Sequence, residues 1–141
     1  TADASGWRAS PARALASRLL FPVPRTRLLI VEDSAIVASA LRLLFEESGY
    51  DVDVASTVKD AIATATARAP EVMLLDLTLP DGDGLTILER LRADGHAPRS
   101  TIALTGHDDD ELRERCIEAG CVDVLLKPVP IARLVELVRS L

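Results

Sequence analysis

Aromatic residues and cysteines are scarce in this chain of 141 residues. Phe, Trp and Tyr make up only 3% of it, whereas apolar residues in total make up 48%, so we expect an aliphatic core. The two cysteines, Cys116 and Cys121, exclude the disulfide framework of a small secreted domain. No His or Cys lies near enough in sequence to complete a zinc site with them. We therefore expect both thiols to be reduced and packed in the core.

Long apolar runs are also absent. None approaches the ~20 residues of a membrane span, and Arg13 and Arg18 interrupt the early apolar residues where a signal peptide needs a continuous run. We therefore expect a cytoplasmic protein without a membrane segment. The formal net charge of −6 argues against direct binding of nucleic acid by the chain as a whole.

The distribution of charge divides the chain into two parts. Residues 1–27 hold five arginines and one aspartate, whereas the rest holds 11 basic and 21 acidic side chains. We predict an extension at 1–26, with a short amphipathic helix and a Pro-rich linker, and one domain at 27–141. The extension is either a remnant of an upstream domain or a plain linker, or it is a helix that docks on this domain or on a second copy. A further hypothesis places the basic extension on the acidic body.

Beyond residue 27, short apolar runs alternate with segments of helical periodicity. Strands are expected at 28–31, 52–55, 72–75, 101–104 and 124–126, and helices at 34–48, 57–68, 85–93, 108–120 and 131–141. Five βα units in succession predict a parallel sheet with helices on both faces, because the crossovers are right-handed. The predicted fold class is therefore α/β, a doubly wound three-layer sandwich.

Reactive residues follow four of the five expected strands. Glu32 and Asp33 follow the first, Asp76 the third, Thr105 the fourth and Lys127 the fifth. Because the carboxyl ends of parallel strands share one edge of the sheet, these residues are expected to meet there. Three crowded carboxylates need a cation, and oxygen ligands favour Mg²⁺. With a lysine and a hydroxyl nearby, the set fits transfer of a phosphoryl group onto a carboxylate.

Each of these residues also has a plain structural interpretation. Glu32 and Asp33 can cap a helix, Thr105 can simply end a strand, and Lys127 can be a solvated charge. For the site to have no function, all of these structural interpretations would have to be true at once, at matching strand ends. This coincidence disfavours them. The segment 81–84 suggests a calcium loop, but the later ligands of an EF-hand are missing, so we interpret it as a turn.

These motifs resemble the receiver domain of bacterial two-component response regulators and hybrid histidine kinases. The resemblance covers residues 27–141 and depends on four motifs in the family's order: Val31-Glu32-Asp33, Asp76 to Gly84, Leu104-Thr105-Gly106 and Leu126-Lys127-Pro128. It implies a flavodoxin-like (βα)5 fold with strand order 2-1-3-4-5. It also implies a role in phosphorelay signal transduction.

The resemblance implies specific roles at the site. Asp76 would accept a phosphoryl group from the phosphohistidine of a histidine kinase or a histidine phosphotransfer protein. Mg²⁺ would be held by Glu32, Asp33, Asp76 and the backbone carbonyl of Thr78. The domain would catalyse only its own phosphorylation and dephosphorylation, and would not be a conventional enzyme.

The resemblance also implies a switch. Thr105 would turn inward to the phosphoryl oxygen, Lys127 would pair first with Asp76 and then with the phosphoryl group, and the bond from Lys127 to Pro128 would be cis. Many receivers carry an aromatic residue three positions before the lysine, where this chain has Val124. Phosphorylation should survive this difference, but the signal then depends on Thr105 and loop movement, or leaves by another surface.

Two other functions stay open. One is a phosphorylation-independent module on a receiver fold that works by docking or as a homodimer, which Val124 and the extension motivate. The other is a small hydrolase with a phospho-aspartate intermediate, which needs a general acid near the nucleophile. No residue clearly fills that role.

Overall fold

Five parallel strands form the central sheet of the computed structural model, which describes residues 24–141. The strands are β1 (Arg27–Val31), β2 (Asp51–Ala55), β3 (Val72–Asp76), β6 (Ser100–Thr105) and β7 (Asp123–Leu126). They pair in the order β2-β1-β3-β6-β7, which confirms the predicted order 2-1-3-4-5 when only these strands are counted. The helix expected in the extension lies outside the described residues.

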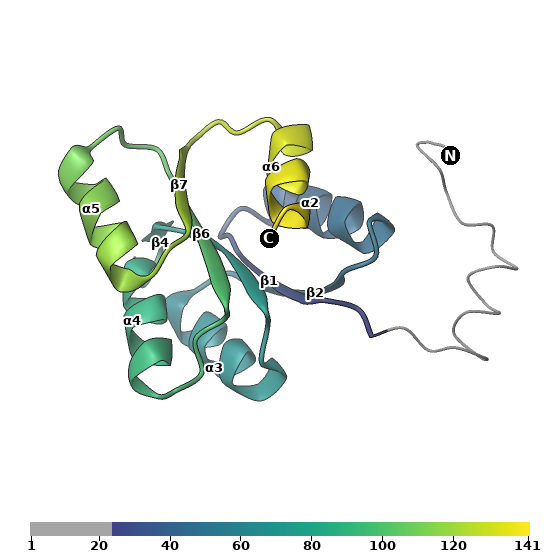
Figure 1. Cartoon of the computed structure of the whole chain (residues 1–141), viewed down its shortest axis with the longest axis horizontal. Coiled ribbons are helices and arrows are strands. Elements are labelled where there is room, and N and C mark those ends of the chain that lie inside the picture. The colour runs from purple at the N-terminus through teal and green to yellow at the C-terminus, as the bar shows by residue number, and fades with distance from the viewer. Residues whose placement is uncertain (1–23) are drawn as a thin grey trace, which may run out of the picture.

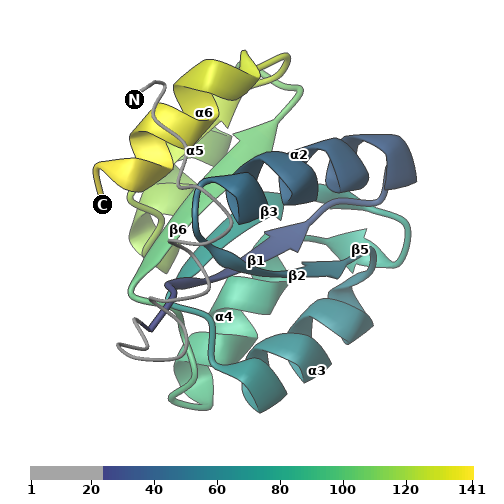
Figure 2. The same ribbon diagram turned by 90° about the vertical axis from the view of Figure 1, so that its right-hand side faces the viewer.

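Helices cover both faces of the sheet (Figures 1 and 2). One face carries α2 (Ala35–Glu47) and α6 (Ile131–Arg139), and the other carries α3 (Val58–Arg68), α4 (Leu85–Ala93) and α5 (Asp110–Ala119). Among residues 24–141, no helix is both long and apolar enough to cross a bilayer. The arrangement confirms the predicted three-layer α/β fold.

Strand β3 contributes to two separate cores. Met73 and Leu75 pack into the cluster on the side of α3, α4 and α5. Val72 and Leu74 pack into the cluster on the side of α2 and α6. Successive side chains of a strand point to opposite faces, so a strand covered on both sides must be apolar at every position. This is why the run before Asp76 is continuously apolar.

Side-chain caps set the starts of three helices. The Oγ of Ser34 accepts a hydrogen bond from the Val37 N–H (3.4 Å), the Oγ1 of Thr57 from the Asp60 N–H (3.0 Å) and Asp109 from the Glu111 N–H (2.9 Å). Such caps satisfy backbone donors that have no partner within the helix. The observed ends agree with the predicted ones to within two residues.

The buried face of α2 differs from the sequence pattern. Helical spacing along the chain predicts one apolar face made of Ile36, Val37, Ala40, Leu41, Leu44 and Phe45. In the structure, however, Ile36 is 84% exposed and Val37 is 44% exposed. The sheet instead buries Ala38 with Leu41 and Phe45. Apolar residues span a wider arc of this helix than the sheet covers, so one edge of the arc faces solvent beside α6.

A short hairpin between β3 and α4 was also not predicted. It consists of β4 (Thr78–Leu79) and β5 (Gly82–Asp83), which pair antiparallel outside the main sheet. Pro80 and the glycines indicated only a turn, because two residues per strand are too few for an alternating pattern. The hairpin starts two residues after Asp76 and therefore borders the predicted site.

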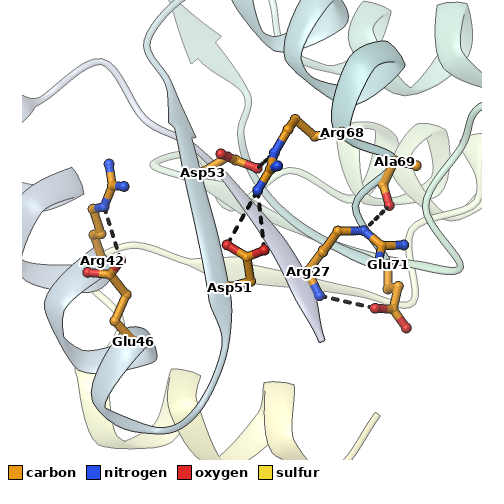
Figure 3. A network of polar contacts seen from close by, with 8 residues as sticks. All are labelled: Arg27, Arg42, Glu46, Asp51, Asp53, Arg68, Ala69 and Glu71. Atoms are coloured by element: carbon orange, nitrogen blue, oxygen red, sulfur yellow. Dashed lines mark hydrogen bonds and ion pairs between the residues drawn. The ribbon is translucent and has the colours of Figure 1, made fainter. Parts of the chain in front are cut away.

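A network of ion pairs lies at the amino ends of the strands (Figure 3). Arg68 at the end of α3 pairs with Asp51 at 3.2 Å and with Asp53 at 3.0 Å, both on the edge strand β2. The backbone N–H of Arg27 donates to Glu71. Charged side chains on an edge strand discourage pairing with other chains, and Asp51 and Asp53 place such charges on β2.

Candidate functional site

The topology brings the predicted site residues to one edge of the sheet. Strands β1, β3, β6 and β7 are consecutive neighbours, and the register places Asp76 beside Leu104 and Thr105 beside Leu126. Glu32 and Asp33 follow β1 directly, and Lys127 follows β7 directly. Residues almost 100 positions apart therefore meet because parallel strands end at the same edge.

Three carboxylates gather at this edge. One oxygen each from Glu32, Asp33 and Asp76 lies within 4.8 Å of the others. Glu32 is only 4% exposed and Asp76 only 3%, whereas Asp33 faces solvent. Burying two like charges side by side is costly unless a cation neutralises them. The all-oxygen donor set fits a hard divalent ion such as Mg²⁺.

Lys127 supplies a positive charge to the cluster. Its Nζ lies 3.0 Å from Oδ2 of Asp76 and 3.4 Å from Oε1 of Glu32. Burial alone would lower the pKa of Lys127, but the hydrogen bond and charge of Asp76, together with the charge of Glu32, outweigh burial and raise it. One ammonium cannot balance three carboxylates, so negative charge remains for a further cation.

Glu32 has a perturbed pKa. Burial raises it above the ordinary 4.5, and the negative charge of Asp76 raises it further. The Ser34 N–H, which donates to Oε2 of Glu32 at 3.1 Å, and the charge of Lys127 act in the opposite direction without cancelling the rise. Burial and the charge of Asp76 thus disfavour the ionised form of Glu32, and a bound divalent cation would favour it.

The backbone after β3 orients the Asp76 carboxylate. The Thr78 N–H donates to Oδ1 of Asp76 at 3.0 Å, while Oδ2 faces Lys127. The chain then folds back so closely that a Cβ at Gly84 would collide with the carbonyl oxygen of Asp76. Glycine is thus required at position 84, where the chain passes from the hairpin into α4.

Thr105 hydrogen-bonds on the side of the following loop. Its buried Oγ1 accepts from the His107 N–H at 3.1 Å. The buried side chain of Val124 and that of Leu112 line a small cavity next to Thr105. Thr105 therefore lies at the end of β6, beside this small cavity.

An apolar groove adjoins the carboxylates. It has a volume of about 780 Å³ and lies between α2 and α6. Ile36 and Val37 line it from α2, Val129 lines it from the segment before α6, and Ile131 lines it from the first residue of α6. The peptide bond between Lys127 and Pro128, at the head of this groove, is cis as expected.

Comparison with known proteins supports a family assignment. The family model described as "Response regulator receiver domain" matches residues 28–139. The chain is 35% identical over 116 residues to the transcriptional regulatory protein TrcR of Mycobacterium tuberculosis, covering 82% of this chain and 44% of that protein. The chain spans about half the length of the curated relatives it matches.

Solved structures agree with this similarity. The receiver domain of Francisella response regulator 1452 has 28% identity and a TM-score of 0.76, covering 82% of this chain and 95% of that one. A CheY-like response regulator receiver domain protein from Methanospirillum hungatei has 26% identity and a TM-score of 0.76, covering 83% and 93%.

Proposed function

Because this chain belongs to the response regulator receiver family of two-component systems, we propose that Asp76 is its phosphoacceptor. The observation that carries the proposal is the environment of this carboxylate. Asp76 is buried, its oxygens are oriented by the Thr78 N–H and by Lys127, and two further carboxylates lie beside it. A nucleophile held in this way needs little reorganisation before it attacks.

The proposed reaction is transfer from a phosphohistidine. A carboxylate oxygen of Asp76 forms a bond to phosphorus, while the bond between phosphorus and the imidazole nitrogen breaks and its electron pair leaves with the imidazole. Mg²⁺, held by Glu32, Asp33, Asp76 and the carbonyl of Thr78, would neutralise charge on the phosphoryl oxygens. Lys127 is already within hydrogen-bonding distance of Asp76 and would pair with the new phosphoryl group.

Thr105 completes the proposed set. Its hydroxyl would leave the His107 N–H and bond a phosphoryl oxygen, which links phosphorylation to movement of the following loop. With Val124 in place of an aromatic side chain, we propose that the signal passes through this loop. The domain would catalyse only its own modification and its own hydrolysis.

Receiver domains partner with histidine kinases, and we propose that the donor here is a kinase or a histidine phosphotransfer protein. A donor must bring an imidazole to Asp76 and must therefore cover the adjoining surface. The groove lined by Ile36 and Val37 gives such a donor an apolar contact next to the acidic pocket. The cytoplasmic location expected from the sequence stays a prediction.

The test is the intact mass of the chain after incubation with acetyl phosphate and Mg²⁺. We expect one added phosphoryl group on the native chain, none on Asp76→Asn, and none on either when a chelator removes the metal. An unmodified native chain would refute the proposal. Repeating the measurement without residues 1–24 tests whether the domain at 27–141 is sufficient.

A docking module that does not need phosphorylation is the second candidate. Val122 and Leu126 on either side of Val124 are about half exposed, as is Ile117 on α5, which leaves an apolar surface for a second copy. Beryllofluoride, a phosphoryl mimic, distinguishes the candidates through sedimentation. A dimer that forms equally with and without beryllofluoride, and also in Asp76→Asn, would favour the docking module.

A further inference from the structure

Asp81 connects the hairpin beside the site to a helix that is distant in sequence. Its Oδ1 accepts a hydrogen bond from the Val58 N–H at 2.7 Å, and its Oδ2 accepts one from the Lys59 N–H at 3.2 Å. Val58 and Lys59 are the first two residues of α3, whose N–H groups have no partner within the helix. The carboxylate thus caps a helix from 23 residues away.

The local cap of α3 is a different residue. Thr57 accepts from the Asp60 N–H through its Oγ1. The start of α3 is therefore shared between Thr57, which touches only its own helix, and Asp81, which ties the helix to the hairpin. Both bonds of Asp81 are charge-assisted, and the positive end of the helix dipole favours an anion at this place.

Apolar contacts place the hairpin against the same helix turn. Leu79 is buried in the core cluster against which Val58 packs. A Cβ at Gly82 would lie 3.8 Å from a methyl carbon of Val58, so the backbone of β5 is close to that side chain. The other end of the hairpin is fixed through Asp83, which accepts from the Leu85 N–H at 2.9 Å and pairs with Arg115 at 3.3 Å.

We propose that Asp81 is a positioning residue that latches the hairpin onto α3 and thereby holds Thr78 in place beside Asp76. Thr78 is the first residue of the hairpin, and its N–H orients Oδ1 of Asp76. Its carbonyl is also the proposed backbone ligand for Mg²⁺, so the metal role of the latch rests on the proposed function. Releasing Asp81 would remove both hydrogen bonds between the hairpin and α3 and would let Thr78 move relative to the carboxylates.

The experiment compares Asp81→Ala with the matched control Thr57→Ala. Both variants remove a cap from the start of α3, but only the first cuts the link to the hairpin. Mg²⁺ is titrated while amide signals are followed by NMR, which also reports whether each variant is folded. Hydrogen exchange is measured at residues 78–83 without metal. Asp81→Asn, which keeps one acceptor oxygen, serves as the conservative variant.

We expect Asp81→Ala to weaken Mg²⁺ binding about tenfold, as loss of outer-shell partners does elsewhere, and to speed exchange in the hairpin. Thr57→Ala should lower the melting temperature but should change neither the Mg²⁺ affinity nor the hydrogen exchange of the hairpin. For Asp81→Asn, both the Mg²⁺ affinity and the exchange rate should lie between those of the native chain and those of Asp81→Ala. The proposal would be overturned if Asp81→Ala kept the native Mg²⁺ affinity and the native hydrogen exchange. It would also be overturned if both alanine variants lost Mg²⁺ affinity and exchange protection equally, because the effect would then result from the stability of α3.

The failure of the proposed function would look different. A native chain that binds no Mg²⁺ would refute the metal site itself, and the metal role of the latch with it. Hydrogen exchange at residues 78–83 would still decide whether Asp81 holds the hairpin, because this measurement needs no metal.

Discussion

The Nζ of Lys127 lies 3.0 Å from Oδ2 of Asp76, although 51 residues separate them in the sequence. The same ammonium is 3.4 Å from Glu32, so one cation serves two buried carboxylates. A shared cation cannot neutralise both. This charge imbalance favours binding of a divalent cation at the site.

Replacing the lysine should destabilise the domain most when metal is absent. In Lys127→Met, Glu32 and Asp76 remain buried without a positive partner. We expect a loss of about 1–3 kcal/mol in unfolding free energy, below the full value for a buried pair because the lysine is 35% exposed. Urea unfolding with and without Mg²⁺ measures the effect, and added Mg²⁺ should restore part of it.

The other lysine of the chain provides the control for this experiment. Lys59 offers only its backbone N–H to Asp81 and carries an exposed side chain. Lys59→Met should therefore unfold like the native chain, with no greater response to Mg²⁺. Equal destabilisation by the two substitutions would mean that the ammonium of Lys127 has no special role.

Glu32→Gln should change how stability depends on pH. Because the folded-state pKa of Glu32 is raised, its stabilising contribution is fully present below the ordinary pKa of 4.5 and is lost as pH rises through the raised value. The metal-free native chain should therefore lose this contribution on going from acid toward neutral pH. Glu32→Gln should not lose it, so the variant should have the higher urea midpoint at neutral pH.

With Mg²⁺ bound, the native chain should have a higher urea midpoint than Glu32→Gln. Glu32→Gln removes one proposed ligand, so Mg²⁺ should stabilise the variant less than the native chain. Asp33→Asn is the matched control, because Asp33 belongs to the same cluster but is exposed to solvent. It should weaken Mg²⁺ binding without raising the metal-free urea midpoint to the same extent. Identical pH profiles for the native chain and Glu32→Gln would contradict the raised pKa of Glu32.

The positions of the strand ends explain why the location of this site could be predicted from the sequence. Apolar runs identify the buried strands, and the alternation of strands with helices indicates that these strands are parallel. Residues that directly follow the strands, such as Asp76 and Lys127, can therefore be placed at one edge of the sheet before their contacts are known. The direction in which side chains face within that edge also depends on packing. The bond from the His107 N–H to Thr105 therefore became visible only in the structure.

Two features could not be predicted, for different physical reasons. The exposure of Ile36 depends on how far the sheet and α6 extend over α2, which periodicity along one helix does not reveal. The latch at Asp81 joins residues 22 and 23 positions apart through backbone donors. Backbone N–H groups look alike in every sequence, so the Asp-Gly pair indicated a turn and nothing about its partner.

The thiols should be unreactive in the folded protein. Cys116 is fully buried and Cys121 is 5% exposed, and burial, reinforced by Cys116, raises the pKa of Cys121 to about 12. The thiolate is the reacting form, so iodoacetamide at mildly alkaline pH should alkylate neither residue in the native chain and both in urea. Mass spectrometry counts the added groups. Rapid alkylation of folded protein would show that the end of α5 opens readily.

Substitution in the groove between α2 and α6 should distinguish the binding of a protein donor from the phosphorylation reaction at Asp76. Ile36 is 84% exposed at its rim, so Ile36→Ser should change the unfolding free energy by less than about 0.5 kcal/mol. Phosphorylation by acetyl phosphate, which needs no docking surface, should proceed at the native rate. Transfer from a phosphorylated histidine protein that modifies the native chain should slow by about five- to tenfold if Ile36 lies in the interface.

Ile117→Ser is the matched control for the groove. Ile117 is also an exposed isoleucine on a helix, 51% exposed, but it lies on α5, on the other face of the sheet from α2. Its substitution should leave transfer from both donors unchanged. Slower transfer from the protein donor in Ile117→Ser alone would move the donor surface to α5. Slower transfer from acetyl phosphate in Ile36→Ser would instead mean that the substitution disturbs Asp76 itself, since that donor reports only the chemistry of the pocket.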